Sequence, residues 1–416
     1  MISIEELSTT LTMILAGGEG DRLQPLTRHR SKPAVPFGGI YRIIDFTLSN
    51  TLNSGLTKLW VLTQYKSTSL MRHIQLGWNL YSAARGEYIY TLPPQRRVDQ
   101  RWYEGTADAV YQNTYLFDLE KPMRVLVLSG DHVYKMDYRQ MIREHVDRKA
   151  KVTLAVCEID IKDAARFGVV EVDESEVVRR FVEKVPDPPC IPGRPERCLA
   201  NMGVYLFDAD TLEAVVHADH DREESSNDFG RDILPLLARE MSVNTFRFRD
   251  PTGHGQPVWW DIGTLDSYYE VTMDLVSVSP TFNLYDRDWP LRSMPRNLPP
   301  AKTVFAAAEG KGPRRVGEAL DSLVSGGCIL SGGFVERSVL SPGVRVNSYA
   351  QVTDSILMDG VSIGRNAKVR KAIIDKGVRV PEGFRIGYDL EEDRKRFTVS
   401  PGGVVVVGMG EVLAEG

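Results

Sequence analysis

The chain has 416 residues, enough for two or three domains of ordinary size rather than one small core. Hydrophobic residues make up 42% and charged residues 26%, which excludes a disordered or fibrous protein. The net charge is −5 and there is no basic block, so nucleic acid is not an expected partner. No apolar run approaches the roughly 20 residues needed to span a membrane, so no membrane partner is expected either.

The start of the chain, MISIEELSTT, is acidic and polar and does not resemble a secretory signal. The four cysteines lack CxxC spacing and have no nearby histidine, so a metal site built on them is not expected. They are Cys157, Cys190, Cys198 and Cys328. Free thiols of this kind are typical of a reducing compartment, and we therefore predict a cytoplasmic protein.

In the first two-thirds of the chain, short β-rich runs alternate with helical patterns. The runs TMIL, KLWVLT, RVLVLSGD, KVTLAV and NMGVYLFD are bounded by turn residues and predict strands. TADAVYQNTYLFDL and DYRQMIREHVDRKA predict amphipathic helices, the second with Asp137 as its N-cap. This alternation predicts an α/β domain with a mainly parallel sheet over residues 1–298.

The first of these strands ends in a glycine-rich loop, GGEG at 17–20. Glycines allow backbone N–H groups to approach a phosphate closely. The loop is not a P-loop, because no Gly-Lys-Ser/Thr follows, and an Asp-Arg pair replaces the third glycine of a dinucleotide fingerprint. By itself such a loop is as often a plain turn as a phosphate site. Arg22 and Lys32 favour phosphate, because a guanidinium fork and an ammonium both suit a polyphosphate.

Three later strand ends carry charged residues. Asp131 follows RVLVLS, at the sheet edge where ligands bind in open α/β folds, and Asp261 lies in a similar setting in VWWDIGT. A single aspartate there is more often a cap or turn residue, but two carboxylates near a phosphate loop can share a Mg²⁺ ion. Their spacing leaves open whether they meet. Glu183 and Lys184 end RRFVEK, where solvated surface charge is the ordinary explanation.

The pattern changes after residue 298. Residues 299–320 are rich in proline and glycine and predict a linker or crossing segment, and residues 321–416 contain a repeat of 17 residues, or 16 in its first step. Three rows of small or apolar residues recur: Leu323, Val339, Ile356 and Ile373; Cys328, Val344, Val361 and Val378; and Phe334, Ala350, Ala367 and Phe384. A chain that turns inward three times per unit predicts a triangular β-solenoid, whose ends need a neighbour to cover them.

Motifs spread over nearly the whole chain, from about Leu11 to about Val407, resemble one family. They include LAGGEGDRLQPLTRHRSKPAVPFGG, WYEGTADAVYQN, SGDHVYKMDY, FVEKV, SSNDFGRDILP, WWDIGTLDSYYE and LVSGGCILSG. Together they resemble the bacterial ADP-glucose pyrophosphorylases, or glucose-1-phosphate adenylyltransferases. The resemblance implies a Rossmann-like nucleotidyltransferase domain followed by a left-handed parallel β-helix. It also implies the reaction of ATP with α-D-glucose 1-phosphate to give ADP-glucose and pyrophosphate, the committed step of bacterial glycogen synthesis.

The resemblance further implies roles for individual residues. Arg22, Lys32 and Asp131 would be catalytic, the first two on the triphosphate, and Asp131 and Asp261 would hold Mg²⁺. The nucleotide would contact Leu15, Ala16, Gly17 and Gly18, and its adenine would contact Gln95 and Gly105. The glucose 1-phosphate would contact Tyr103, Gly168, Glu183, Lys184 and Asn201. Because the sugar phosphate is already an anion, its attack on the α-phosphorus needs no general base.

This sequence departs from the family pattern at a few positions. Glu19 stands where many relatives carry arginine, and Asn201 replaces the usual serine. Lys184 is followed by Val185, so the usual proline comes one place later. A carboxylate at position 19 is expected to weaken triphosphate binding unless it faces solvent or pairs with a cation.

The resemblance also implies a homotetramer with anionic metabolite effectors. Arg30 and Arg42 match positions that bind an adenylate inhibitor in relatives, whereas His29 replaces a lysine used there for a sugar-bisphosphate activator. Lys395 and Arg396 keep a basic pair near the C-terminus. These four cations are candidates for an effector site, and ordinary surface charge is the alternative.

Three other functions compete with this reading. One is a sugar nucleotidyltransferase that uses UTP, dTTP or GTP. Another is an acyltransferase, since β-helices often carry that chemistry, but all seven histidines precede the repeat and no general base is available there. The third is a non-catalytic regulatory subunit, which would be expected to lose the arginine, lysine or carboxylates that this chain keeps.

Overall fold

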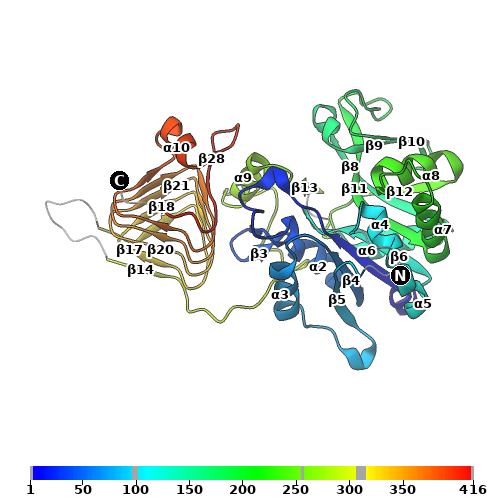
Figure 1. Cartoon of the computed structure of the whole chain (residues 1–416), viewed down its shortest axis with the longest axis horizontal. Helices are drawn as coiled ribbons and strands as arrows, with labels where there is room; N and C mark the ends of the chain where they lie inside the picture. The colour runs from blue at the N-terminus through cyan, green and yellow to red at the C-terminus, as the bar shows by residue number, and fades with distance from the viewer. Residues whose placement is uncertain (1–2, 96–101, 254–256, 306–314, 414–416) are drawn as a thin grey trace.

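The structure, a computed structural model, describes residues 3–95, 102–253, 257–305 and 315–413. Figure 1 shows an α/β domain beside a β-helix, with the chain passing from the first to the second along one side. All four cysteines are free, as predicted. Within the described ranges, no helix combines the length and the apolar character that crossing a bilayer requires.

A mixed nine-stranded sheet organises the α/β domain. Its main path runs β10-β9-β11-β6-β1-β4-β5, and β8 and β12 extend it beside β11. The half that carries the glycine-rich loop, β6-β1-β4-β5, is parallel, whereas β11 joins β6 in the antiparallel sense. The strands are β1 (Thr10–Ala16), β4 (Lys58–Thr63), β5 (Tyr88–Leu92), β6 (Arg124–Ser129), β8 (Val152–Asp160), β9 (Gly168–Val172), β10 (Val178–Glu183), β11 (Arg197–Asp208) and β12 (Val243–Arg247).

Helices cover both faces of this sheet, so its central strands are buried on both sides. In β1, Leu11 and Met13 belong to one core, while Ile14 and Ala16 belong to the core on the other face. Such burial explains why the parallel strands appear as continuous apolar runs. The helices are α1 (Ile4–Ser8), α2 (Ile43–Asn53), α3 (Thr68–Gly77), α4 (Thr106–Tyr111), α5 (Tyr115–Glu120), α6 (Tyr138–Asp147), α7 (Ala209–His220), α8 (Leu234–Glu240) and α9 (Leu265–Asp274).

Short elements complete the domain. The ribbon of β7 (His132–Tyr134) and β13 (Trp259–Asp261) is antiparallel and lies at the carboxyl end of β6. The others are β2 (Pro36–Phe37), β3 (Tyr41–Arg42), the 3₁₀ turns η1 (Asp21–Leu23), η2 (Lys32–Ala34), η3 (Ala83–Arg85) and η4 (Ile161–Arg166), and the π-helical turn η5 (Phe229–Ile233).

The five strands predicted from apolar runs are confirmed as β1, β4, β6, β8 and β11. The Asp137 carboxylate caps α6 by accepting a hydrogen bond from the Arg139 backbone N–H, also as predicted. The predicted helix TADAVYQNTYLFDL is instead two helices, α4 and α5. The helix breaks because Asn113 and Thr114 turn their side chains back to backbone carbonyls of α4, which competes with regular helical hydrogen bonding.

The second domain is a parallel β-helix of three sheets, and its coils repeat every 16 or 17 residues in register. The first sheet contains β14 (Lys302–Val304), β17 (Ile329–Ser331), β20 (Arg345–Val346), β23 (Ser362–Ile363) and β26 (Arg379–Val380). The second contains β15 (Glu318–Leu320), β18 (Phe334–Glu336), β21 (Gln351–Thr353), β24 (Lys368–Arg370) and β27 (Arg385–Ile386). The third contains β16 (Leu323–Val324), β19 (Val339–Leu340), β22 (Ile356–Leu357), β25 (Ala372–Ile374), β28 (Thr398–Val399) and β29 (Val405–Val407), and α10 (Leu390–Arg396) follows the second sheet.

The three predicted inward rows do not all face the interior of the β-helix. The row that starts at Cys328 does, and Ala350, Ala367 and Phe384 of another row also lie in that core. The row of Val339, Ile356 and Ile373 points outward, into a core shared with the α/β domain. The prediction is also wrong in placing Phe334 in the same row as Ala350. Phe334 pairs in register with Gln351, the next residue along.

The shared core joins the third sheet of the β-helix to α9 and to the segment around α2. Between the domains the chain runs as an irregular segment past α2, where the Asn53 side chain donates to the Pro290 carbonyl (2.9 Å) and the Ser293 hydroxyl donates to Asp45 (2.6 Å). Two stretches of the predicted linker 299–320 are strands of the β-helix, β14 and β15, so they are not an unpaired connection.

Candidate active site

The glycine-rich loop begins where β1 ends, between the parallel neighbours β4 and β6. A side chain at Gly17 would lie 3.1 Å from the Gln64 Cβ, whereas nothing lies within 4 Å of the corresponding position at Gly18. Gly20 has a left-handed φ of 70°, and its carbonyl accepts a hydrogen bond from the Thr27 hydroxyl (2.8 Å). The loop is therefore anchored at one end and open to a ligand at Gly18.

A cavity of about 300 Å³ lies against this loop. The residues predicted to hold the nucleotide line it as follows: Leu15, Ala16, Gly17, Gly18 and Gly105. Glu19 lines it too, with an exposed side chain that forms no ion pair with any described residue. Gln95 does not line this cavity; its amide donates to the Pro93 carbonyl (3.0 Å), and the residues that follow it lie outside the described ranges.

Gly105 and Tyr103 form part of the wall of the same cavity. A Cβ at Gly105 would lie only 2.1 Å from the Asn227 carbonyl oxygen, so the backbone approach there requires glycine. The Tyr103 hydroxyl accepts a hydrogen bond from the Asn113 amide (2.9 Å), and its ring is buried. Tyr103, predicted to contact the sugar phosphate, thus lines the same cavity as the residues predicted for the nucleotide.

A second cavity of about 260 Å³ adjoins the first. Four of the five residues predicted for glucose 1-phosphate line it: Gly168, Glu183, Lys184 and Asn201. The two cavities share six wall residues: Leu15, Lys32, Thr106, Ser129, Asp131 and Asp228. A ligand in one cavity would therefore meet a ligand in the other beside Lys32 and Asp131.

The second cavity is shaped by close contacts at the ends of β9 and β10. Gly168 has no room for a side chain, since its Cβ would lie 2.6 Å from a Glu183 carboxylate oxygen. The Lys184 ammonium lies 2.5 Å from the other Glu183 oxygen. Asn201 donates from its amide to the Tyr205 hydroxyl (2.8 Å) and accepts from the Gly203 backbone N–H (3.1 Å), at a point where the register of β11 shifts.

The structure brings Asp131 and Asp261 together, which their spacing in the sequence left open. The β7–β13 ribbon pairs Asp261 with His132, directly after Asp131. The Lys32 ammonium bridges the two carboxylates, at 2.8 Å from Asp131 and 3.0 Å from Asp261. Arg22 lines the second cavity beside them, with Nη2 about 3.3 Å from where a Cβ on Gly263 would lie.

Opposite charges keep Lys32, Asp131 and Asp261 ionised although these residues are largely buried. Burial raises the pKa of the Asp131 carboxyl, but Lys32 and His132 outweigh it and hold that pKa below its ordinary value. The pKa of Asp261 is lowered against burial by the same two residues, although the Asp131 charge opposes this. Burial lowers the pKa of Lys32, and the two carboxylates reverse that and raise it. Both carboxylates are ionised and the lysine is protonated at neutral pH.

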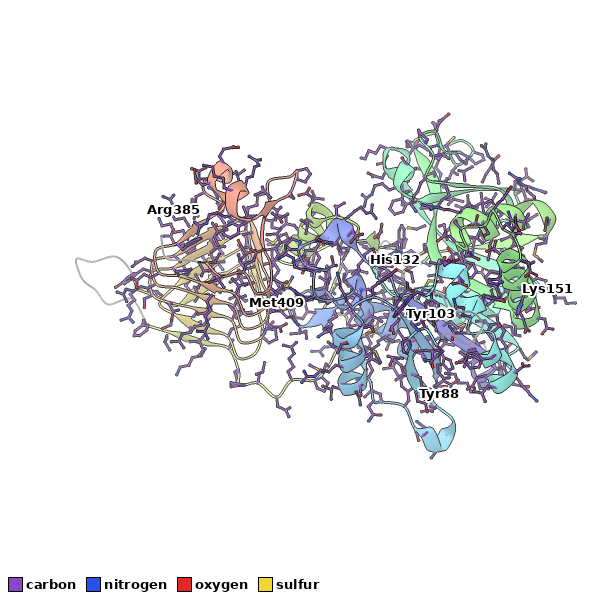
Figure 2. All side chains as sticks on the ribbon, viewed as in Figure 1. Tyr88, Tyr103, His132, Lys151, Arg385 and Met409 are labelled. Carbon is purple, nitrogen blue, oxygen red and sulfur yellow. The ribbon has the colours of Figure 1, made fainter. Side chains whose placement is uncertain are left out.

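The same cluster is suited to a metal ion. One ligand atom from each of Asp131, His132 and Asp261 lies within 4.8 Å of the others. Carboxylate oxygens are the ligands of hard divalent cations, and here the Lys32 ammonium occupies the position between them. The Ser129 hydroxyl donates to Asp131 and orients it. His132, labelled in Figure 2, packs its ring edge on Trp259, and its Nδ1 is buried without a partner among the described residues.

Sequence reasoning missed three residues of this centre. His132 is adjacent to Asp131 in SGDHVY, Asp228 lies in the quoted motif SSNDFGRDILP, and Thr106 follows Gly105. The Asp228 carboxylate caps η5 by accepting from the Gly230 N–H (2.9 Å) and also accepts from the Thr106 hydroxyl (3.0 Å). Its position after a run of polar residues and before an apolar turn was the available signal.

The candidate effector residues fall into two separate places. Arg30 is buried, and its guanidinium donates to both oxygens of Asp375 (2.5 and 2.6 Å) across the domain contact. Nearby, the Arg42 guanidinium donates to the Ser69 carbonyl (2.7 Å), and burial lowers the pKa of Arg42 to about 10. Asp359, Arg296 and Lys376, missed in the sequence, form ion pairs in the same region.

Lys395 and Arg396 lie on α10, at the end of the β-helix. Lys395 is exposed and pairs with Glu392 (2.6 Å), while the Arg396 guanidinium lies 4.5 Å from the ring centre of Phe384. Figure 1 shows α10 at the outer side of the β-helix, well separated from β3, which contains Arg42. The four predicted cations therefore do not form one cluster in the described part of the chain.

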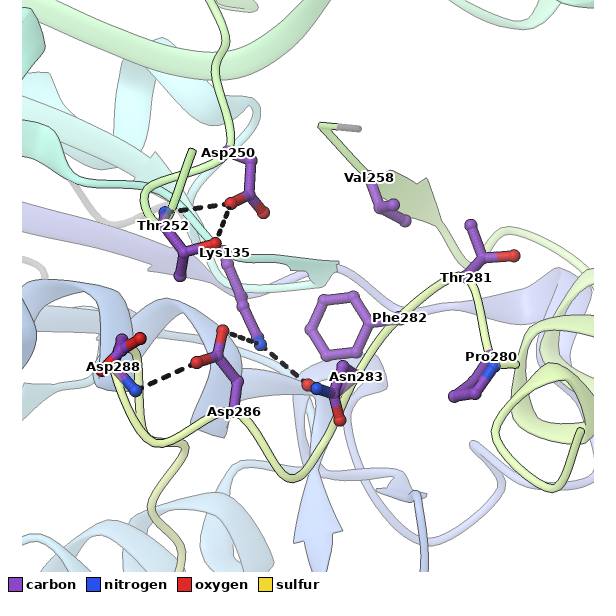
Figure 3. Close-up of a pocket in the computed structure, with 10 residues that line it drawn as sticks. All are labelled: Lys135, Asp250, Thr252, Val258, Pro280, Thr281, Phe282, Asn283, Asp286 and Asp288. Carbon is purple, nitrogen blue, oxygen red and sulfur yellow. Dashed lines mark hydrogen bonds and ion pairs between the residues drawn. The ribbon is translucent and has the colours of Figure 1, made fainter. Parts of the chain in front are cut away.

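A further cavity of about 360 Å³ lies at the other end of the β7–β13 ribbon (Figure 3). Lys135 reaches into it and donates to the Asn283 carbonyl (2.7 Å) and to Asp286 (2.8 Å). Asp250 and Asp288 also line it, so acids outnumber the single lysine. None of the predicted site residues lines this cavity, and its charge does not suit a phosphate.

Comparison with known proteins matches both domains of the chain. Residues 11–278 match the family model for nucleotidyl transferases, and residues 299–407 match that of the GlmU-like C-terminal hexapeptide. The glucose-1-phosphate adenylyltransferase of Koribacter versatilis is 51% identical over 400 residues, covering 96% of this chain and 95% of that protein. The chain belongs to the glucose-1-phosphate adenylyltransferase family.

Other members of the family are similarly close. The glucose-1-phosphate adenylyltransferase of Rhodopirellula baltica is 50% identical over 407 residues, covering 97% of this chain and 91% of the relative. That of Methylococcus capsulatus is 48% identical over 398 residues, covering 96% and 93%. The matches span both domains, so the predicted order of nucleotidyltransferase domain and left-handed β-helix is confirmed.

Proposed function

We propose that this protein transfers the adenylyl group of ATP to α-D-glucose 1-phosphate and releases pyrophosphate. The observation that carries the proposal is the meeting of two cavities at Lys32 and Asp131. One cavity has the open glycine loop suited to a nucleotide, and the other has the carboxylate and ammonium groups suited to a sugar phosphate. ADP-glucose formed in this way is the donor for bacterial glycogen synthesis.

In the proposed reaction, a phosphate oxygen of the sugar phosphate attacks the α-phosphorus of ATP. The bond from that phosphorus to the bridging oxygen breaks, and the electron pair leaves with pyrophosphate. No proton is removed from the nucleophile, so the residues act by alignment and by neutralising charge. Lys32 is suited to the charge that builds on pyrophosphate because it lies at the cavity junction between Asp131 and Asp261. Arg22 is suited to it because its guanidinium lines the adjoining cavity near Gly263.

Asp131 and Asp261 would hold Mg²⁺ through carboxylate oxygens, with Ser129 keeping the Asp131 side chain in place. When bound there, Mg²⁺ would supply positive charge that offsets the negative charge of the phosphates. The Lys32 ammonium would move from between the carboxylates onto the triphosphate. Glu183 and Lys184 would bind the sugar phosphate, and Asn201 would orient the sugar. The adenine would lie against Gly105, with Gln95 as its second expected contact.

The protein is expected to work as a cytoplasmic homotetramer under the control of anionic metabolites. Arg42 supports an effector site at the domain contact, because Arg296 and Lys376 add positive charge in the same region. Arg30 would take part only if its buried pair with Asp375 opened. Lys395 and Arg396 would belong to it only if α10 of another subunit approached the contact. Measuring rates with and without phosphorylated sugars and adenylates would identify the effectors.

The test is the initial rate of pyrophosphate release by the purified chain with glucose 1-phosphate and each of ATP, UTP, dTTP and GTP. We expect ATP to give the fastest turnover and EDTA to abolish it, with recovery on adding Mg²⁺. Faster turnover with UTP would favour the other sugar nucleotidyltransferases. No pyrophosphate release with any nucleotide would favour a non-catalytic subunit.

A further inference from the structure

The second cavity contains four cationic side chains, and two of them are already neutralised. They are Arg22, Lys32, Arg166 and Lys184. Lys32 is held between two carboxylates, and the Lys184 ammonium lies 2.5 Å from Glu183. A substrate phosphate must compete with these acids for either lysine. Binding of a dianionic sugar phosphate therefore calls for further positive charge in this cavity.

Arg166 is the cation at the sugar end of the cavity that has no such competitor. Its side chain is exposed, and its guanidinium lies 5.5 Å from the ring centre of Phe167. It forms no ion pair or hydrogen bond with any residue in the described ranges. Arg22 is equally unpaired in those ranges, but it lies at the other end, beside Asp261 and Gly263.

The backbone places Arg166 next to Lys184. Arg166 is the last residue of η4, whose Ala164 is buried and accepts a hydrogen bond from the Phe167 backbone N–H (2.9 Å). The Phe167 carbonyl in turn accepts from the Lys184 backbone N–H (3.0 Å). The Phe167 ring packs on Trp259, with ring centres 5.1 Å apart. Both side chains thus leave the same fixed part of the cavity wall.

We infer that Arg166 is a substrate-binding residue whose guanidinium contacts the phosphate of the sugar phosphate together with Lys184. The sequence pattern does not reveal this role, because a single arginine at the end of a 3₁₀ turn is usually surface charge. The inference deepens the proposed function and rests on it. A planar guanidinium can donate two hydrogen bonds to one phosphate, which an ammonium paired with Glu183 cannot match.

Lys162 provides a matched control within the same turn. Its ammonium is exposed and lies 3.3 Å from Asp160, and it does not line the cavity. Removing its charge changes the long-range field of η4 about as much as removing that of Arg166. A difference between the two variants therefore reports a direct contact.

The experiment compares Arg166→Gln, Arg166→Lys and Lys162→Gln with the unaltered protein. Pyrophosphate release is followed at saturating ATP and Mg²⁺ while glucose 1-phosphate is varied, and then the reverse. We expect Arg166→Gln to raise the KM for glucose 1-phosphate about tenfold, the loss of one charge-assisted hydrogen bond, with the KM for ATP unchanged. Arg166→Lys should recover part of the loss, and Lys162→Gln should show none.

A second measurement separates binding from a structural role. Glucose 1-phosphate alone should raise the thermal unfolding midpoint of Lys162→Gln more than that of Arg166→Gln, while the two free proteins unfold at similar temperatures. An unchanged KM for glucose 1-phosphate in Arg166→Gln would overturn the inference while leaving the proposed function intact. Absence of turnover in the unaltered protein would instead overturn the proposed function.

Discussion

Arg30 and Lys32 are two positions apart in the chain, yet their side chains meet carboxylates in opposite settings. The Lys32 ammonium bridges Asp131 and Asp261 at the junction of two cavities, where the aspartate side chains are 28% and 17% exposed. The Arg30 guanidinium is held by Asp375 between the domains, where that aspartate is fully buried. The first cluster is open to ligands, and the second is closed by packing.

The difference shows why similar pairs have different consequences. A pair at a cavity wall can exchange its partner for a phosphate or a metal ion, so it contributes to chemistry. In a closed pair, neither group has an alternative partner. Removing one of the two groups therefore leaves the other charge buried, with neither solvent nor a counter-ion beside it. Because one short segment carries both cations, residues 30–32, which lead into the turn η2, join the active site to the β-helix.

The largest expected effect comes from Asp131→Asn. This change removes one of the two carboxylates at the cavity junction, and we expect turnover to fall about a thousandfold, as when a single charge-stabilising group is deleted. The thermal unfolding midpoint should change little, because Asp131 lies at a cavity wall. Steady-state kinetics and differential scanning calorimetry check the two parts. Near-normal turnover would remove Asp131 from the catalytic centre.

The closed cluster should respond in the opposite way. Asp375→Ala leaves the Arg30 charge buried and uncompensated, and we expect the free energy of unfolding to fall by about 3 kcal/mol. Denaturant titration measures the loss. The control is Asp354→Asn, which breaks the exposed pair with Arg337 in the β-helix, suits the left-handed φ of 49° at this position and should cost about 1 kcal/mol or less. Equal losses in the two variants would contradict the contrast between closed and open clusters.

Lys184→Ala tests a cation whose partner is an acid in the same cavity. Its loss should raise the KM for glucose 1-phosphate about tenfold, through one charge-assisted contact, and leave kcat nearly unchanged. Initial rates over a range of glucose 1-phosphate concentrations give both constants. An unchanged KM would mean that the ammonium stays on Glu183 when the substrate binds.

The smallest effect is expected at Glu19. The carboxylate lines the nucleotide cavity and has no cation paired with it in the described ranges, so it repels a triphosphate. Glu19→Arg should lower the KM for ATP about threefold, a modest effect because the side chain is exposed and screened by solvent. Glu19→Gln separates loss of repulsion from gained attraction. A KM for ATP that stays constant or rises in both variants would place the carboxylate away from the phosphates.

The strand ends that carry active-site residues could be predicted from the sequence. The apolar run before Asp131 and the glycines after β1 each define a strand end, and strand ends of a parallel sheet carry ligands. The meeting of Asp131 with Asp261 was not accessible, because it depends on the pairing of β7 with β13 across more than a hundred residues of chain. The switch of Tyr103 to the nucleotide cavity has the same origin, since long-range packing decides it.

The β-helix illustrates a different limit. Its 17-residue period was readable, but each coil of the third sheet carries two adjacent apolar residues, such as Ile356 and Leu357 or Ile373 and Ile374. In a strand, neighbours point to opposite faces, so one of each pair must face outward. The pattern alone cannot decide which one. The outward face can carry apolar side chains only because the other domain packs against them.

The outward row of Val339, Ile356 and Ile373 has a consequence for how this protein can change during evolution. Solenoids commonly gain and lose whole coils, since each coil contacts only its neighbours. Here successive coils also pack against α9 and the neighbouring residues of the α/β domain. Deleting one coil would shift every later apolar side chain by a full repeat relative to the catalytic domain. The length of this β-helix is therefore matched to the domain beside it. Truncating the β-helix would expose an apolar surface on the α/β domain.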